Sequence, residues 1–149
     1  MTVRTENSIV IHAPLEKVFQ TTANLLLWPS VLPHYRWVRV LKTGDEGLIV
    51  KMAARRGWLP IQWTSRFKAD GVAHELHFQH LKAPTRGMHV KWTYTPAPEG
   101  VLVRISHEMN RTSALGHWFA NRVLGKMFIS PVATLTLTRF KQHLEQNRT

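Results

Sequence analysis

Polar side chains that can carry protons stand inside apolar stripes in the second half of the sequence. His80, Tyr94 and His107 each lie in a run that alternates apolar and polar residues. Residues two apart in a strand share a face, so each of these side chains should lie among apolar neighbours. A buried histidine or tyrosine needs a hydrogen-bond partner, and a ligand can be that partner. We predict that these residues contact a ligand, with simple core packing as the alternative.

Aromatic residues occupy the same stripes. The chain has 6 tryptophans, more than packing alone usually requires. If several line one cavity, their flat rings would favour stacking on a polycyclic or quinone ligand. The predicted ligand-binding residues are Trp28, Trp63, Phe67, Phe78, His80, Trp92, Tyr94 and His107. The pattern singles out no catalytic residue among them.

Several other chemistries lack support in the sequence. His74, His77 and His80 are evenly spaced, but in a strand His77 points to the opposite face. The outer two would be about 20 Å apart at ~3.3 Å per residue, too far for one metal ion. The chain has no cysteine, no Gly-x-Ser-x-Gly motif and no phosphate-binding glycine loop. We therefore expect no metal site and no cofactor.

The helices and strands that position these residues can be predicted from hydrophobic periodicity and from the Gly and Pro residues that interrupt it. Ser8–Ile11 predicts a strand that ends at Pro14, where a helix over 15–24 begins. A second helical segment over 25–32 is interrupted by Pro29 and closed by Pro33. Six strands follow, at about 35–42, 47–55, 60–69, 72–81, 87–96 and 101–109. Short loops rich in Gly, Asp and Pro join them, so the strands should form an antiparallel meander.

The chain is predicted to end in a long helix from Ala114 to about Gln146, with Thr112 and Ser113 as N-cap residues. Gly125 and Pro131 should bend or fray this helix. One face carries an apolar stripe, formed by Ile129, Ala133, Leu137, Phe140 and Leu144. This face must dock on an apolar surface of the sheet.

Composition indicates one globular domain spanning residues 1–149. Apolar residues make up 44% of the chain and charged residues 19%, which argues against disorder. The polar N-terminus lacks a signal-peptide core, and no stretch approaches the ~20 apolar residues that span a bilayer. Nothing here requires an oxidising compartment, so we expect a cytoplasmic protein.

The formal net charge of +11 is the strongest anomaly in the composition. It predicts an acidic partner or surface, either an acidic carrier protein or an anionic membrane surface; the alternative is that it only maintains solubility. We do not expect a nucleic acid partner, because the sequence has no RNP-like motif, zinc finger or recognition helix.

Ile11-His12-Ala13-Pro14-Leu15-Glu16-Lys17-Val18-Phe19, followed by Trp28-Pro29 and Pro33, resembles the opening of a known family. This is the polyketide cyclase/dehydrase and coenzyme-Q-binding branch of the START-like (SRPBCC, Bet v 1-like) helix-grip superfamily. The resemblance covers nearly the whole chain. It implies an α+β fold, in which a seven-stranded curved antiparallel sheet wraps around a long C-terminal helix, with two short helices after strand 1.

The resemblance also implies a ligand between the sheet and the terminal helix. That ligand would be small and hydrophobic or aromatic, of polyketide, lipid or quinone type. Two functions stay open at this point: a polyketide aromatase/cyclase, and a non-catalytic lipid or quinone carrier or chaperone.

Overall fold

The computed structural model describes residues 2–82, 85–110 and 129–146. Strand β1 (Thr2–Ile11) is followed by helix α1 (Leu15–Ala23), the short 3₁₀ helix η1 (Leu25–Leu27) and helix α2 (Trp28–Val31). Six further strands are β2 (Tyr35–Gly44), β3 (Gly47–Arg56), β4 (Leu59–Asp70), β5 (Glu75–His80), β6 (His89–Ala97) and β7 (Gly100–Asn110). Helix α4 (Ser130–Gln146) comes last.

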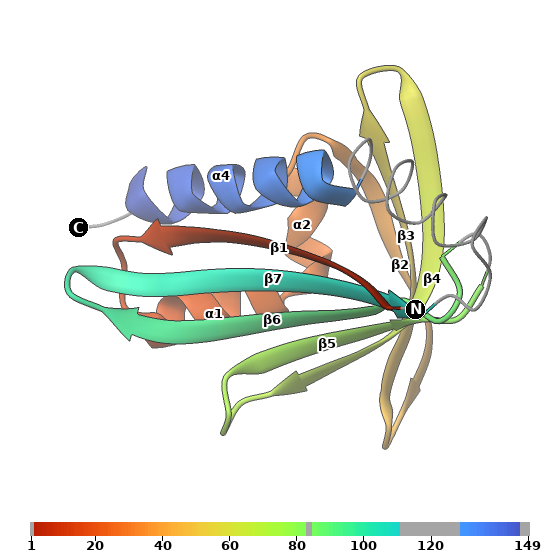
Figure 1. Ribbon diagram of the computed structural model, residues 1–149, viewed down its shortest axis with the longest axis horizontal. Helices are drawn as coiled ribbons and strands as arrows, with labels where there is room; N and C mark the ends of the chain where they lie inside the picture. The colour runs from red at the N-terminus through yellow and green to blue at the C-terminus, as the bar shows by residue number, and fades with distance from the viewer. Residues whose placement is uncertain (1, 83–84, 111–128, 147–149) are drawn as a thin grey trace.

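The strands form one seven-stranded sheet in the order β1-β7-β6-β5-β4-β3-β2, antiparallel at every pairing. Figure 1 shows the sheet curving so that the hairpin of β3 and β4 stands beside one end of α4. The predicted curved antiparallel sheet, with short helices after strand 1 and a C-terminal helix, is confirmed.

Helix α4 lies along β1, and polar contacts fix it there (Figure 1). The Lys141 ammonium donates to the Val10 carbonyl at 2.7 Å, and the His12 amide donates to Glu145 Oε2 at 2.9 Å. Asn7 Nδ2 donates to Ser130 Oγ at 3.1 Å. The apolar stripe of α4 faces the sheet as predicted, because Ala133, Leu137, Phe140 and Leu144 are all buried.

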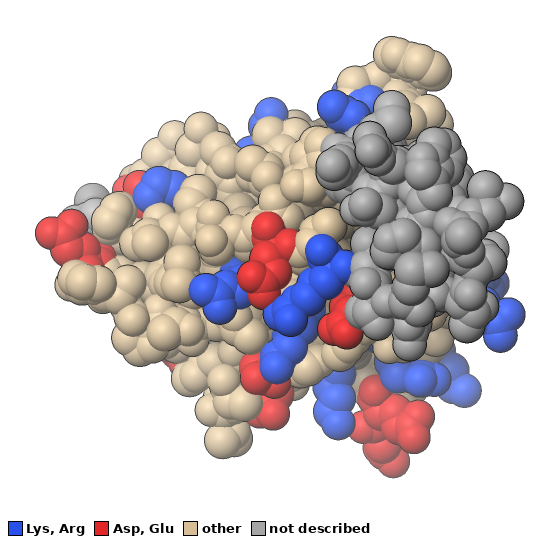
Figure 2. All heavy atoms as spheres, in the orientation of Figure 1, with Lys and Arg blue, Asp and Glu red and all other residues tan. Residues whose placement is uncertain are grey.

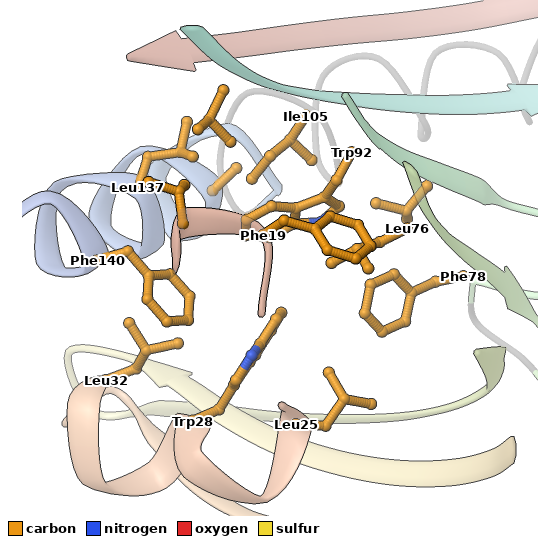
Figure 3. Packing of buried hydrophobic residues seen from close by; sticks show 14 of the residues in the cluster. Phe19, Leu25, Trp28, Leu32, Leu76, Phe78, Trp92, Ile105, Leu137 and Phe140 are labelled. Atoms are coloured by element: carbon orange, nitrogen blue, oxygen red, sulfur yellow. The ribbon is translucent and has the colours of Figure 1, made fainter. Parts of the chain in front are cut away.

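Period-two alternation correctly gives the inner face of the sheet. In β5 the buried residues are Leu76, Phe78 and His80; in β6 they are Val90, Trp92 and Tyr94; in β7 they include Val101, Val103 and Ile105. The apolar side chains among them form the core together with α4 and the short helices, and Figure 3 shows Phe78 and Trp92 from the sheet near Phe140 from α4.

Some element boundaries differ from the prediction. Strand β1 begins at Thr2, not Ser8, because its polar first half still pairs with β7 through the backbone. Strand β5 begins at Glu75, because Asp70 Oδ1 accepts the amides of Val72 and Ala73, both at 3.0 Å, and lengthens the turn. His74 closes that turn with φ 55°.

The terminal helix can be compared with the prediction only from residue 129 onward. The proposed N-cap at Thr112 and Ser113, the helix over 114–128 and its expected bend at Gly125 lie outside the described residues. Pro131 lies in the first turn of α4, where a missing amide donor is tolerated. Among the described helices, none is both long and apolar enough to cross a membrane.

Candidate functional site

A cavity lies between the concave face of the sheet and α4. Its walls are formed by Trp28, Tyr35, Met52, Ile61, Trp63, Phe78, His80, Thr85, Met88, Val90, Trp92, Ile105, His107, Ile129, Val132, Ala133 and Thr136. The cavity volume is about 80 Å³, and about 610 Å³ when the open space at its mouth is included. The cavity is smaller than the ~150 Å³ apolar cavity that holds benzene, so a larger ligand would extend beyond it toward solvent.

The structure brings most of the predicted ligand-binding residues together around this cavity. Those in its wall are Trp28, Trp63, Phe78, His80, Trp92 and His107. They come from helix α2 and from strands β4 to β7, as alternation on neighbouring strands requires. Their contact with a ligand stays a prediction.

Phe67 and Tyr94 lie outside the cavity wall. Phe67 is buried behind it and packs on Phe78, with ring centroids 4.8 Å apart. Tyr94 lies nearer the other end of β6, where its hydroxyl is 2.5 Å from Thr22 Oγ1 on α1 and its ring meets Phe19 edge-on. Burial raises the pKa of Tyr94 above its ordinary value. The structure therefore gives Tyr94 a role in joining α1 to the sheet.

Replacing Tyr94 with phenylalanine is expected to lower the free energy of unfolding by about 1 kcal/mol, because one buried hydrogen bond is lost. Thr22 Oγ1 can still donate to the Val18 carbonyl at 2.9 Å, so no donor is left unpaired. Urea denaturation measures the change. Ligand affinity should stay at the wild-type value; a tenfold loss of affinity with unchanged stability would contradict this assignment.

Trp28 occupies the centre of the aromatic wall. Its ring packs against Tyr35, Trp92, Phe140 and Phe78, with centroid distances of 5.1, 5.6, 5.7 and 6.0 Å. Figure 3 shows the indole rising from α2 between Phe140 and Phe78. Its Nε1 donates to the Thr22 carbonyl at 3.0 Å, which fixes the ring. Trp28 is therefore a fixed part of the cavity wall, held by rings from the sheet and from α4.

His80 presents a neutral imidazole to the cavity. Its Nδ1 is 2.6 Å from Thr85 Oγ1, and its ring stacks on Trp63 with an interplanar angle of 11°. Burial lowers the pKa of His80 to about 4. At neutral pH the ring is therefore uncharged, and the hydroxyl of Thr85 holds its orientation.

His107 is the second imidazole in the wall. It lies on β7, where it pairs with Val90 of β6. Its Nδ1 is enclosed and has no hydrogen-bond partner among the described residues. Burial, together with the nearby His80, lowers the pKa of His107 to about 3. A buried polar atom without a partner costs free energy that a ligand can recover.

Sequence reasoning missed three polar residues of the wall: Tyr35, Thr85 and Thr136. Thr136 lies between Ala133 and Phe140 on the apolar face of α4, and a polar residue in an apolar stripe is the signal that identified His80. Tyr35 is the first residue of β2, separated from α2 by a short loop, and its side chain is buried. Thr85 lies in a loop, where no periodicity marks it.

The evenly spaced histidines separate as predicted. His77 lies on the outer face of the sheet, where its Nδ1 is 3.1 Å from His89 Nε2 and its Nε2 is 3.0 Å from Glu75 Oε1. His74 contacts Glu16 from the turn before β5. Over residues 2–82, 85–110 and 129–146, no group of three ligating side chains is arranged to hold a metal ion.

Comparisons with known proteins agree with this architecture. A protein from Streptomyces halstedii that is provisionally named a polyketide cyclase is 29% identical to this chain over 110 residues. The aligned residues cover 70% of this chain and 98% of the relative. The crystal structure of the Zhui aromatase/cyclase from a Streptomyces species has a TM-score of 0.80 at 17% identity, covering 98% of this chain and 95% of that one. The ginseng major latex-like protein 151 from Panax ginseng has a TM-score of 0.74 at 10% identity, covering 96% and 97%.

The two structures share the fold of this chain, the helix-grip arrangement that the opening residues predict. A family model described as polyketide cyclase / dehydrase and lipid transport matches residues 2–145, which is nearly the whole chain. The protein therefore belongs to the polyketide cyclase/dehydrase and lipid transport family.

Proposed function

We propose that this protein binds a small aromatic or hydrophobic ligand of polyketide type in the cavity and acts on it as an aromatase/cyclase. The observation that carries the proposal is the pair His80 and His107: two uncharged imidazoles face an aromatic cavity, and His107 Nδ1 lacks a partner among the described residues. The aromatase/cyclase and cyclase names of the relatives support the reaction class.

An uncharged imidazole can serve as a general base at neutral pH. The burial that lowers its pKa also weakens it as a base, so a rate gain at the lower end of the usual range is expected. It removes a proton from a methylene between two carbonyls of a poly-β-keto chain, and the resulting enolate carbon attacks another carbonyl of the same chain. A carbon–carbon bond forms, and the attacked oxygen takes the proton back from the imidazolium. Loss of a second α proton, with protonation of the new hydroxyl, releases water and leaves a double bond.

The aromatic wall would supply the geometry for this reaction. Trp63 stacks on His80, and Trp92 lies on the neighbouring wall from β6. Flat rings restrict a folded chain to a few orientations, which raises the effective concentration of one reacting carbonyl over the others. The charge of +11 supports delivery of the chain on an acidic carrier protein.

The test replaces His80 or His107 with glutamine and supplies a poly-β-keto chain tethered to an acidic carrier protein. Each substitution is expected to slow formation of the cyclised product by about 10²-fold, the lower end of the range for general acid–base catalysis. His74→Gln is the matched control, because His74 lies outside the cavity wall and should leave the rate unchanged. A wild-type product distribution equal to that without protein would contradict a catalytic function.

The carrier function is the second candidate, and the composition of the wall favours it. Most lining residues are apolar, and the matching family includes lipid transport. A carrier needs only to shield apolar surface from water. Mass spectrometry of an extract from the purified protein distinguishes the two: a stoichiometric lipid or quinone would favour the carrier over the enzyme.

A further inference from the structure

A second, wider groove borders α4 and adjoins the cavity. Its lining residues are Arg4, Thr5, Pro33, His34, Arg55, Arg56, Gly57, Trp58, Ser130, Pro131, Val132, Thr134, Leu135, Thr138 and Arg139. The groove has a volume of about 1320 Å³. Val132 lines both the groove and the cavity, so the two spaces adjoin at this side chain.

The groove is rich in arginine and contains no carboxylate. All 9 Asp and Glu residues of the chain lie in the described ranges, and none of them lines the groove. On the face shown in Figure 2, no acidic side chain is visible beside the basic side chains near the tip of the β3–β4 hairpin, whereas both signs mix over β1 and β5 to β7. The Nε of Arg139 is buried and has no hydrogen-bond partner among the described residues.

His34 contributes a hydrogen-bond acceptor, its Nδ1, to the lining of the groove. Thr136 Oγ1 donates to the Val132 carbonyl at 2.8 Å, so it must accept the hydrogen bond from His34 Nε2 at 2.9 Å. In the neutral ring Nδ1 is then the acceptor nitrogen, and it has no partner in the described part of the chain. Burial, with a contribution from Arg139, lowers the pKa of His34 to about 4. The residue is only 6% exposed.

We propose that this groove binds the phosphate-ester end of an amphiphilic ligand whose apolar end lies in the cavity, an inference that rests on the proposed function. The guanidinium groups of Arg55 and Arg139 supply several donors to the phosphate oxygens. His34 Nδ1 accepts from a hydroxyl or amide beside the phosphate. Trp58, at the hairpin tip, is 89% exposed and offers a flat surface that the ligand would cover.

The test compares octyl phosphate with octanol by isothermal titration calorimetry. Arg139→Gln and Arg55→Gln are each expected to raise the dissociation constant of octyl phosphate about tenfold or more, the usual effect of losing a charged hydrogen bond. Octanol should bind all variants equally. Arg55 is exposed, so its variant carries the test if Arg139→Gln does not fold.

Arg66→Gln is the matched control. Arg66 is an exposed arginine of β4, paired with Ile49 and Gln79 on the outer face of the sheet and away from the groove. It should change octyl phosphate binding by less than about twofold. Equal losses in the Arg66, Arg55 and Arg139 variants would show a general charge effect and overturn the proposal.

Vesicles separate the two sources of a phosphate ester. Binding to phosphatidylglycerol vesicles that requires Arg139, combined with octyl phosphate binding that does not, would assign the groove to a membrane and overturn the proposal. If octanol fails to bind the wild-type protein and the tethered poly-β-keto chain is not cyclised, the proposed function fails. If octanol binds and the phosphate adds no affinity, only the groove assignment fails.

Discussion

Replacing Trp28 with alanine is expected to lower the free energy of unfolding by about 3–5 kcal/mol, the usual cost of removing a large aromatic ring from a core. The side chain is 2% exposed and touches rings from the sheet and from α4 at once. The substitution also leaves the Thr22 carbonyl without its 3.0 Å donor. Urea denaturation at neutral pH measures the change.

The same substitution is expected to enlarge the cavity, whose volume is only about 80 Å³. A two-ring probe such as naphthalene should therefore bind the Trp28→Ala variant more tightly than the wild type. Trp37→Ala is the control, because Trp37 lies under the Arg39 guanidinium, 4.1 Å from its ring centroid, and outside the cavity wall. Naphthalene affinity that does not increase in the Trp28 variant would show that another side chain limits the cavity.

The inner face of the sheet could be predicted from the sequence because alternation alone determines it. Phe78, His80, Trp92 and His107 follow a two-residue period, and the core side of each strand is the apolar one. Antiparallel hairpins then place the strands side by side. Face and strand order together were enough to bring these residues to one cavity.

Position along a strand could not be predicted in the same way. Tyr94 and Trp92 share a face, yet Trp92 reaches the cavity while Tyr94 meets Thr22 on α1. Which helix covers which end of the sheet depends on packing between residues far apart in sequence. The contact between His34 and Thr136, 102 positions apart, also depends on such packing. The arginine-lined groove could therefore not be predicted from hydrophobic periodicity.

Lowering the pH from 7.5 to 5 is expected to reduce the free energy of unfolding by about 6 kcal/mol through three histidines, His34, His80 and His107. Burial holds their folded-state pKa values at about 4, 4 and 3. In the unfolded chain each has a pKa of about 6.5, so at pH 5 the unfolded state binds protons that the folded state excludes. This difference lowers the free energy of unfolding by about 2 kcal/mol per residue.

Stability is lost on the acid side because the folded-state pKa values are lowered. The stabilising contribution of the three histidines is complete above about pH 6.5 and is lost as the pH falls toward about 4. A loss of this size is comparable to the whole stability of many domains, so the protein should begin to unfold near pH 5. The carboxylates with lowered pKa values, among them Glu75 and Glu145, act only at lower pH. Histidine protonation therefore sets the onset.

The double variant His80→Gln/His107→Gln separates this effect from the repulsion that a net charge of +11 produces. Glutamine cannot take up a proton, so the difference in unfolding free energy between pH 7.5 and pH 5 should shrink by about 4 kcal/mol. The comparison uses the change with pH within each protein, so any intrinsic cost of the substitutions cancels. A double variant with the wild-type pH dependence would mean that surface charge, not the buried imidazoles, drives the acid transition.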